Sequence, residues 1–397
     1  MKILFLTPQL PYPPQKGTAL RNWGLISGLA ERHDIALLSF LDPRQPSCVE
    51  PPLERRCRTE VIHPPSRSTL DRLRTLFTAK PDMARRLDSP TYAERLADWL
   101  ERETFDVVQI EGIELAPYLD VIEEAEPRPF VVFDDHNCEY LLQKRTFKTD
   151  LANPFRWPAA IYSFIQWQRL KRYEAKVCRR ADHVLAVSQA DAAALKKIVP
   201  QVEITVVPNG IDTSVYTPKL VNHRNPLTVF TGTMDFRPNV DAVLWYTRQV
   251  WPLIKAEEPE ARFVVVGQRP HKRLEELRRD PSIRVTGHVE EVRPYIKEAS
   301  VYVAPLRMGG GTRLKLLEAM AMGKPVVATR LGAEGYPITD GQELLLADSP
   351  TAFAQAVIEL LRSRTLRADL GRAARSFVEA NYDWQAIVPR VEAIYPK

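Results

Sequence analysis

Three consecutive glycines stand directly before a strongly helix-forming stretch. The segment Arg307–Thr329 reads RMGGGTRLKLLEAMAMGKPVVAT, in which Gly309, Gly310 and Gly311 lead into Thr312. A glycine-rich loop between a strand and a helix lets the backbone approach a phosphate, and the amides and dipole of the helix N-terminus favour an anion. The segment therefore predicts a phosphate-binding loop followed by a helix that begins at Thr312.

Two charged side chains lie one turn inside this predicted helix. Lys315 and Glu318 are three residues apart and so share a helix face. We expect Lys315 to meet a phosphate and Glu318 to accept hydrogen bonds from a diol such as a ribose. Arg313 either adds charge at the same place or is a solvated helix residue. The alternative interpretation of the whole segment is a flexible loop followed by a surface ion pair.

Strand and helix patterns, which must position these residues, alternate along the whole chain. Most apolar segments, such as KILFLTP, HVLAVS and VYVAPL, read as nearly continuous apolar runs rather than as alternating polar and apolar residues. Strands that are buried on both faces look like this, and they occur in parallel sheets covered by helices. Because helical patterns separate these segments, the chain is predicted to form doubly wound α/β units.

The strand candidates fall into two sets, separated by a polar, proline-bounded linker at residues 217–226. A chain of 397 residues is also longer than one ordinary domain. We therefore predict two Rossmann-like domains in series, residues 1–217 and 226–380. In open α/β sheets ligands bind beyond the carboxyl ends of the strands, so a site is expected in a cleft between the domains.

The composition is that of a soluble globular protein, with 45% hydrophobic and 26% charged residues. The N-terminal stretch MKILFLTPQLPYPP is too short for a signal peptide, and no later run could span a bilayer. The four cysteines show neither a CxxC pair nor the spacing of a zinc site. We expect reduced thiols in a cytoplasmic protein.

The net charge of +5 is unevenly distributed. The segment Leu142–Arg180 holds ten Lys and Arg residues against two acidic residues, and it mixes them with aromatic side chains. Such a segment suits a helix that lies on an anionic membrane surface. The alternative is a helix that packs on the core and keeps a solvated basic face. Nucleic acid is not an expected partner, because no recognition motif accompanies the charge.

Two motifs of the first half also end strand candidates. Gly17 stands alone before a helix predicted to start near Thr18, which disfavours the GxGxxG turn of a dinucleotide enzyme and leaves an ordinary turn glycine as the alternative. The segment FDDHNCEY places Asp134, Asp135 and His136 at the tip of a strand. Two adjacent carboxylates are weak evidence for a metal, and a lone histidine at a strand end is often structural.

Together these motifs resemble those of retaining glycosyltransferases of family 4. The matching segments include LTPQLPYPPQKGTALRNW, FDDHNCEY, VVPNGIDTSVYTP, FTGTMDFRPNVDAV, GTRLKLLEAMAMGKPVVAT and LGAEGYPITDGQELLLAD, in the family's order over residues 1 to about 350. The resemblance implies the GT-B fold, in which two Rossmann-like doubly wound domains face each other across a cleft. It also implies that the C-terminal helix, residues 381–397, packs back on the first domain.

The resemblance also implies roles for single residues on the donor side. Glu318 matches the family's ribose-binding glutamate, and Gly17 sits where the family's first loop approaches the donor. A second glutamate of the family is replaced here by Gly310, as in a variant with the arrangement Gly-Thr-x-x-Lys-x-x-Glu. Glu334, in the segment GAEG, either contacts donor or acceptor or caps a helix.

The remaining implied roles concern the diphosphate and the reacting sugar. The family often has two basic residues after the glycine that is Gly232 here, but this chain has Thr233 and Pro238 at those positions. Arg237 is therefore expected to help Lys315 neutralise the leaving diphosphate. His136 matches a family histidine near the reacting sugar.

The expected activity is transfer of a sugar from a UDP- or GDP-sugar to a glycan or lipid-linked glycan with retention of configuration, in polysaccharide or cell-envelope synthesis. No metal and no cofactor are expected, and the leaving phosphate is expected to help deprotonate the acceptor on the same face of the sugar. Two alternatives remain open. One is a nucleotide-sugar 2-epimerase of the same fold, and the other is a sugar-nucleotide-binding protein without turnover. The expected location is the cytoplasm, with peripheral attachment to the inner face of the membrane as a further expectation.

Overall fold

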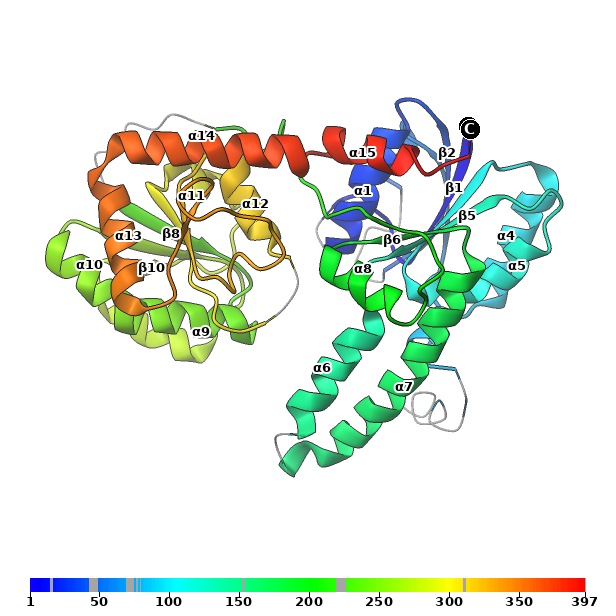
Figure 1. Cartoon of the computed structure of the whole chain (residues 1–397), viewed down its shortest axis with the longest axis horizontal. Coiled ribbons are helices and arrows are strands. Elements are labelled where there is room, and N and C mark those ends of the chain that lie inside the picture. Colours follow the sequence, from blue (N-terminus) through cyan, green and yellow to red (C-terminus); the bar gives the residue numbers. More distant parts are fainter. Residues whose placement is uncertain are drawn as a thin grey trace. The chain divides into compact units, whose positions relative to one another are not determined.

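Two compact units make up the chain in the computed structural model, which describes residues 1–14, 17–42, 49–68, 75, 78, 80–151, 154–218, 226–309 and 312–396. Unit 1 comprises Met1–Gly210 and Ile387–Lys397, and unit 2 comprises Ile211–Ala386. Each unit is built on its own fully parallel sheet with helices around it (Figure 1). The predicted pair of Rossmann-like doubly wound units is therefore confirmed.

Unit 1 has a seven-stranded sheet in the order β3-β2-β1-β4-β5-β6-β7. The central strands are almost wholly buried, as expected for continuous apolar segments covered on both faces. The order reverses between β1 and β4, and ligands of such sheets bind beyond the carboxyl ends of the strands at this switch point. The strands are β1 (Lys2–Thr7), β2 (Asp34–Phe40), β3 (Arg58–Ile62), β4 (Val107–Glu111), β5 (Phe130–Asp135), β6 (His183–Ala186) and β7 (Ile204–Val206).

The helices of unit 1 connect these strands in the right order for parallel pairing. They are α1 (Gly17–Leu29), α2 (Pro51–Glu54), α4 (Pro90–Arg102), α5 (Leu119–Glu123), α6 (Glu139–Leu151), α7 (Trp157–Arg180) and α8 (Gln189–Lys196), with short 3₁₀ turns at Met83–Arg85, Ile113–Tyr118 and Pro154–Arg156. The last helix of the chain, α15 (Trp384–Glu392), packs on α1 so closely that a Cβ at Gly28 would lie 2.5 Å from Val388 Cγ2.

The basic aromatic segment forms a helical hairpin rather than a single helix. Helices α6 and α7 lie side by side and extend away from the sheet of unit 1 (Figure 1). The C-terminal half of α7 packs into the core through Leu170 and Val177. Its N-terminal half carries exposed aromatic residues. Core packing, one of the two alternatives for this segment, thus holds for the C-terminal half of α7.

Unit 2 has a six-stranded parallel sheet in the order β10-β9-β8-β11-β12-β13. The order reverses between β8 and β11, which places a second switch point there. The strands are β8 (Leu227–Thr231), β9 (Arg262–Val266), β10 (Ile283–Val285), β11 (Val301–Ala304), β12 (Val326–Ala328) and β13 (Leu345–Leu346). The helices are α9 (Arg237–Trp245), α10 (Trp251–Glu257), α11 (Arg293–Glu298), α12 (Leu314–Ala321), α13 (Pro350–Arg362) and α14 (Arg364–Asn381), with a π-turn at Tyr246–Val250 and a 3₁₀ turn at Lys272–Arg279.

Two further expectations concern the membrane and the cysteines. Among the described residues, no helix is both long and apolar enough to cross a bilayer. Cys57, Cys138 and Cys178 are buried free thiols, and Cys48 lies outside the described residues.

Candidate functional site

The predicted phosphate loop lies at the switch point of unit 2, between β11 and α12. Gly309 has a left-handed backbone with φ of 104°, which glycine adopts at little cost. Gly310 and Gly311 lie outside the described residues. The predicted helix start at Thr312 is two residues early, because α12 begins at Leu314 and Arg313 occupies the N-cap position. Thr312 instead lies against Gly335, in the loop after β12.

Lys315 connects α12, which follows β11, to the other side of the switch point, formed by β8 and α9. Its Nζ donates a hydrogen bond of 2.8 Å to Asn239 Oδ1 on α9 and lies 4.4 Å from the centre of the Phe230 ring on β8. Burial lowers the pKa of Lys315 to about 7. Among the described residues, no carboxylate lies within ion-pair distance of this amine. Lys315 is therefore a half-buried amine whose charged form an arriving anion would favour.

Two glycines allow the backbone to pass close to Lys315. A Cβ at Gly232, directly after β8, would lie 2.5 Å from Lys315 Nζ and 2.7 Å from Asn239 Nδ2. A Cβ at Gly267, directly after β9, would lie 1.7 Å from the carbonyl oxygen of Gly232. The amide of Gly232 donates to Val266 O at 2.9 Å, which fixes the two loops to each other. Gly232 is thus adjacent to Lys315, and the structure brings together these two residues of the predicted donor side.

We expect Gly232→Ala to weaken anion binding at Lys315 by displacing the amine, while Gly267→Ala destabilises the fold by about 1–3 kcal/mol through overpacking. Gly341→Ala is the matched control, because Gly341 also has a positive φ but a Cβ there would meet no atom within 4 Å. Thermal unfolding and calorimetric titration with UDP and GDP separate the two effects. If Gly267→Ala and Gly341→Ala lost equal stability, backbone strain rather than close packing would explain why residue 267 is a glycine.

Glu318 lies one turn beyond Lys315 and is held by an aromatic hydroxyl. Tyr216 Oη donates to Glu318 Oε1 at 3.3 Å, and burial raises the pKa of this carboxyl. Tyr216 belongs to the segment VVPNGIDTSVYTP, in which no role was predicted for the tyrosine. The glutamate keeps further acceptor capacity, since a carboxylate has two oxygens.

The other charged residues predicted for the donor side differ in exposure. Arg237 is the first residue of α9 and is exposed. Arg313 is half-buried beside Gly309, and burial lowers the pKa of its guanidinium although the charge of Glu334 opposes this. Glu334 itself is exposed in the loop after β12. Arg313 and Glu334 thus lie near each other, whereas Arg237 stands at the start of a separate helix.

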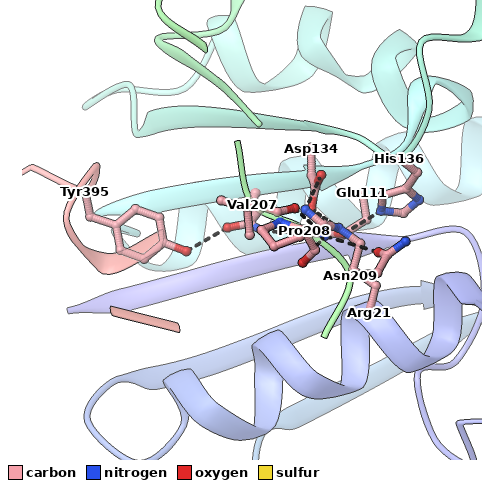
Figure 2. Close-up of polar contacts among 9 residues, drawn as sticks. Arg21, Glu111, Asp134, His136, Val207, Pro208, Asn209 and Tyr395 are labelled. Carbon is pink, nitrogen blue, oxygen red and sulfur yellow. Dashed lines mark hydrogen bonds and ion pairs between the residues drawn. The ribbon is translucent and has the colours of Figure 1, made fainter. Parts of the chain in front are cut away.

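In unit 1, a buried arginine organises the tip of β5 (Figure 2). Arg21 on α1 donates to both oxygens of Asp134, at 2.8 and 2.9 Å. Its Nη1 also donates to Val207 O at 2.9 Å, to Pro208 O at 3.2 Å and to Asn209 Oδ1 at 3.3 Å. This arginine therefore fixes the Asn-Gly turn after β7 to the strand that carries the predicted histidine. No motif in the sequence indicated this role for Arg21.

His136 belongs to a chain of hydrogen bonds that reaches the C-terminal end of the protein (Figure 2). Its Nε2 lies 2.7 Å from Glu111 Oε2, Gln109 Nε2 donates to Glu111 Oε1 at 2.6 Å, and Tyr395 Oη donates to Gln109 Oε1 at 2.6 Å. Burial opposes protonation of His136, but its hydrogen bond to Glu111 and the charge of Asp134 outweigh this and raise its pKa. The Glu111 pKa is also raised, by burial and by the nearby Asp134 charge.

A metal ion does not fit the carboxylates and histidine at this place. Three possible ligand atoms lie within 4.8 Å of one another here, one from each of Glu111, Asp134 and His136. Both Asp134 oxygens, however, accept from the Arg21 guanidinium, whose positive charge would oppose a second cation. The cluster is better described as an internally paired network that holds His136 in place.

Asp135 points to a different part of unit 1. Glu174 on α7 accepts from the backbone amides of Glu139 and Tyr140, at 2.8 and 2.9 Å, and so caps the start of α6. Burial raises the pKa of Glu174 to about 7 and, together with the Glu174 charge, raises that of Asp135 well above its usual range. The second aspartate of FDDH therefore belongs to the base of the hairpin.

Gly17 and Gly112 show how glycines near the unit 1 switch point differ. Gly17 is the exposed first residue of α1, and a Cβ there would meet no atom within 4 Å. Gly112 directly follows β4 with φ of 96°, and a Cβ there would lie 3.2 Å from Glu114 Oε2 and 3.6 Å from His136 Nδ1. The imidazole of His136 thus lies against Gly112, a residue for which the sequence motifs predicted no role.

Sequence profiles of two related families match this chain in succession. The profile described as "Glycosyltransferase Family 4" matches residues 17–215, and that described as "Glycosyl transferases group 1" matches residues 225–363. The first match falls almost entirely on unit 1, and the second falls within unit 2.

Curated relatives agree with these profiles. A phosphatidyl-myo-inositol mannosyltransferase of Propionibacterium freudenreichii subsp. shermanii is 31% identical over 232 residues, which cover 55% of this chain and 57% of that protein. Spore coat protein SA of Bacillus subtilis is 19% identical over the whole length of both chains. Apart from such full-length matches, the chain spans about half the length of the curated relatives it matches.

Solved structures share the fold over both units. Sucrose-phosphate synthase from Thermosynechococcus elongatus has a TM-score of 0.69 at 17% identity, covering 100% of this chain and 98% of that chain. Anabaena HepE in complex with UDP has a TM-score of 0.65 at 17% identity, covering 99% of each chain. These similarities support the GT-B fold. Since the first profile covers half of the chain and the second continues it through unit 2, the chain belongs to glycosyltransferase family 4.

Proposed function

We propose that this protein transfers a sugar from a nucleoside-diphosphate sugar to a glycan or lipid-linked glycan, with retention of anomeric configuration. The observation that carries the proposal is Lys315, a half-buried amine at the switch point of unit 2 whose hydrogen bond goes to a neutral amide oxygen. Breaking the bond between sugar and diphosphate develops negative charge on the leaving group. Lys315 becomes charged when that anion arrives and stabilises it.

On this proposal, different residues around Lys315 bind different parts of the donor. Lys315, Arg237 and Arg313 neutralise the diphosphate, and Glu318 accepts hydrogen bonds from the ribose. Backbone amides of the loop approach the phosphates, and Glu334 and Gly17 lie near the donor. The loop residues are Gly309, Gly310, Gly311 and Thr312. Gly232, whose own amide donates to Val266 O, contributes by letting the backbone pass close to Lys315 at the donor.

The reacting sugar is assigned to His136. Its ring is held by Glu111 at 2.7 Å, so the imidazole has a fixed orientation from which to hydrogen-bond a sugar hydroxyl. No side-chain carboxylate is assigned as a covalent nucleophile, and the leaving phosphate is proposed to help deprotonate the acceptor. The proposal needs no metal ion, because basic side chains and oriented amides supply the positive charge.

The names of related proteins and of structural neighbours support the proposed substrate classes. HepE was crystallised with UDP and with UDP-glucose, and a Corynebacterium glutamicum relative is named a GDP-mannose-dependent mannosyltransferase. Several relatives are named phosphatidyl-myo-inositol mannosyltransferases, which act on a lipid. A UDP- or GDP-sugar is therefore the proposed donor, and a lipid-linked acceptor is the proposed partner.

A thermal-shift panel of UDP-, GDP- and ADP-sugars, with and without EDTA, tests donor binding. We expect one nucleotide class to raise Tm in both conditions, since a ligand at about 100 times its Kd adds about 2.7 kcal/mol of stability. No shift with any nucleotide sugar would contradict the proposal. Isomerised free donor without acceptor would identify an epimerase, and binding without release of nucleoside diphosphate for any acceptor would identify a non-catalytic binding protein.

Binding of a nucleoside diphosphate should also take up a proton above neutral pH. The pKa of Lys315 is about 7 in the folded protein, and a bound diphosphate favours the ammonium form. At pH 8.5 phosphate groups are fully ionised, since their second pKa is about 6, so the proton goes to the protein. Calorimetry in buffers of different ionisation enthalpy should show uptake of up to about one proton by the wild type. Equal uptake by Lys315→Met would contradict this assignment.

The same pKa fixes how the unliganded protein responds to pH. An unfolded lysine keeps its proton up to a pKa of about 10.4. Between about pH 7 and 10 the unfolded chain therefore binds more protons than the folded chain, so this group makes the free energy of unfolding rise with pH. Nucleotide affinity should fall over the same range, because the free amine must then be protonated on binding.

A further inference from the structure

Exposed apolar side chains gather on one short part of the chain. Of the ten large hydrophobic side chains that are exposed among the described residues, six lie between Leu142 and Phe164. Phe155 is 96% exposed and Ile161 is 65% exposed. Isolated exposed hydrophobic residues are common, but a cluster of this kind marks an interaction surface. The six residues are Leu142, Leu151, Phe155, Trp157, Ile161 and Phe164.

Four of these residues form the far end of the α6–α7 hairpin, which we call the hairpin tip. Leu151 is the last residue of α6, Phe155 lies in the 3₁₀ turn, and Trp157 begins α7. Ile161 follows Trp157 by four residues and so lies on the same helix face. The hairpin extends away from the sheet of unit 1, so this end is held clear of the core of its own unit (Figure 1).

A partly exposed cluster of aromatic rings joins the two helices of the hairpin directly behind the tip. The rings of Phe147, Phe164 and Trp167 lie 5.4–5.9 Å apart between α6 and α7. Asp150 and Arg156 form an ion pair of 3.0 Å across the turn. The ring cluster and this ion pair therefore join the two helices directly behind the hairpin tip.

Positive charge surrounds the hairpin tip on the α6 side. Arg145 and Lys148 are exposed, and Lys144 lies over the Trp167 ring at 5.1 Å. The acidic residue of this region, Asp150, is buried and paired with Arg156. The hairpin thus ends in apolar and aromatic side chains and carries basic side chains behind them on α6. This arrangement suits the interface of a bilayer that contains anionic headgroups.

We propose that the hairpin tip inserts into the interface of a membrane containing anionic lipid. Phe155, Trp157, Ile161 and Leu151 enter the headgroup region, where aromatic side chains are favoured. Arg145 and Lys148 then meet the phosphates of the headgroups. A membrane interface accounts for both features of this end of the hairpin, the exposed apolar side chains and the basic residues behind them. This proposal is independent of the proposed sugar transfer.

Flotation of the full-length protein with vesicles tests this surface. The probes are vesicles of phosphatidylglycerol with phosphatidylcholine and vesicles of phosphatidylcholine alone. We expect the wild type to bind the anionic vesicles and to bind neutral vesicles at least about tenfold more weakly. Leu151→Ser/Ile161→Ser and Arg145→Glu/Lys148→Glu should each reduce binding to anionic vesicles by about tenfold or more.

Val215→Ser/Leu253→Ser is the matched control, since these residues are exposed by 43% and 41% but lie in unit 2. We expect this variant to float like the wild type. Circular dichroism and Tm establish that every variant is folded before flotation. Equal loss of binding in the control, or equal binding of the wild type to both vesicle types, would overturn the proposal.

Brominated lipids give a second readout that does not depend on folding stability. Bromine in the acyl chains quenches tryptophans that reach the interface, and Trp157 is 56% exposed at the tip. Trp157→Phe keeps an aromatic side chain, so it should still float but should lose most of the quenching. Unchanged quenching in Trp157→Phe would overturn insertion by the tip. Self-association of the wild type that Leu151→Ser/Ile161→Ser abolishes, without vesicle binding, would overturn it as well.

Discussion

Lys315→Met is expected to weaken binding of UDP or GDP by about 10- to 100-fold, because a hydrogen bond to a charged group contributes about 1.5–3 kcal/mol. Methionine has a similar length and can pack on the Phe230 ring in place of the lysine chain. The folded protein should keep its stability or gain some below pH 7, because an amine with a lowered pKa is removed. Isothermal titration calorimetry at pH 7 measures the affinity.

Lys324→Met provides the matched control for this prediction. Lys324 is a buried lysine, and its pKa is likewise lowered by burial, to about 8. Its Nζ donates to the backbone carbonyl oxygens of Lys297 and Ala299, so its role is internal. Lys324→Met should lower Tm and leave nucleotide affinity unchanged. The role assigned to Lys315 is contradicted if both variants lose affinity alike, or if Lys315→Met binds as tightly as the wild type.

Arg21→Met is expected to destabilise the protein by about 3–5 kcal/mol, because it leaves the buried Asp134 carboxylate without its partner. The Arg21 and Asp134 side chains are 1% and 0% exposed, and the arginine also donates to the carbonyl oxygens of Val207 and Pro208. Loss of Arg21 therefore leaves several buried acceptors unpaired at once. Urea unfolding followed by fluorescence and by circular dichroism measures the free energy of unfolding.

Arg32→Met is the control for the buried arginine. Arg32 and Glu392 form a similar two-bond pair, at 2.8 and 2.6 Å, but the arginine side chain is 51% exposed. An exposed pair contributes about 0–1 kcal/mol, so this variant should be nearly neutral. The double variant Arg21→Met/Asp134→Leu should be less destabilised than Arg21→Met alone. A small effect of Arg21→Met, or an equal effect of Arg32→Met, would argue against the role assigned to Arg21.

The fold could be predicted because its evidence is local. Continuous apolar strands separated by helical patterns describe a covered parallel sheet without reference to distant residues. The closeness of Lys315 and Glu318 follows likewise from helix geometry. The start of α12 was predicted two residues too early, because Arg313 rather than Thr312 holds the N-cap position and no side chain caps the helix.

The partners of the site residues could not be predicted, because they are far apart in the chain. Asn239 reaches Lys315 across 76 residues, Tyr216 reaches Glu318 across 102, and Tyr395 reaches Gln109 across 286. No periodicity or spacing in a single sequence encodes such pairs.

The two aspartates of FDDH illustrate the same limit within one motif. Successive residues of a strand point to opposite faces of the sheet. Asp134 pairs with Arg21, whereas Asp135 lies near Glu174 at the base of the hairpin. The alternation was predictable, but the partner on each face was not. The hairpin itself was missed for a related reason, since composition does not distinguish the packed end of α7 from its exposed end.

The most direct test of the proposed function follows the donor and the product together. The full-length protein is incubated with the nucleotide sugar that gives the largest thermal shift and with a membrane lipid extract as the acceptor source. We predict nucleoside-diphosphate release that depends on the extract, a product whose anomeric proton in NMR shows the donor's configuration, and slower release by Lys315→Met. Inverted configuration, isomerised donor, or release that does not depend on acceptor would contradict retaining glycosyl transfer by this protein.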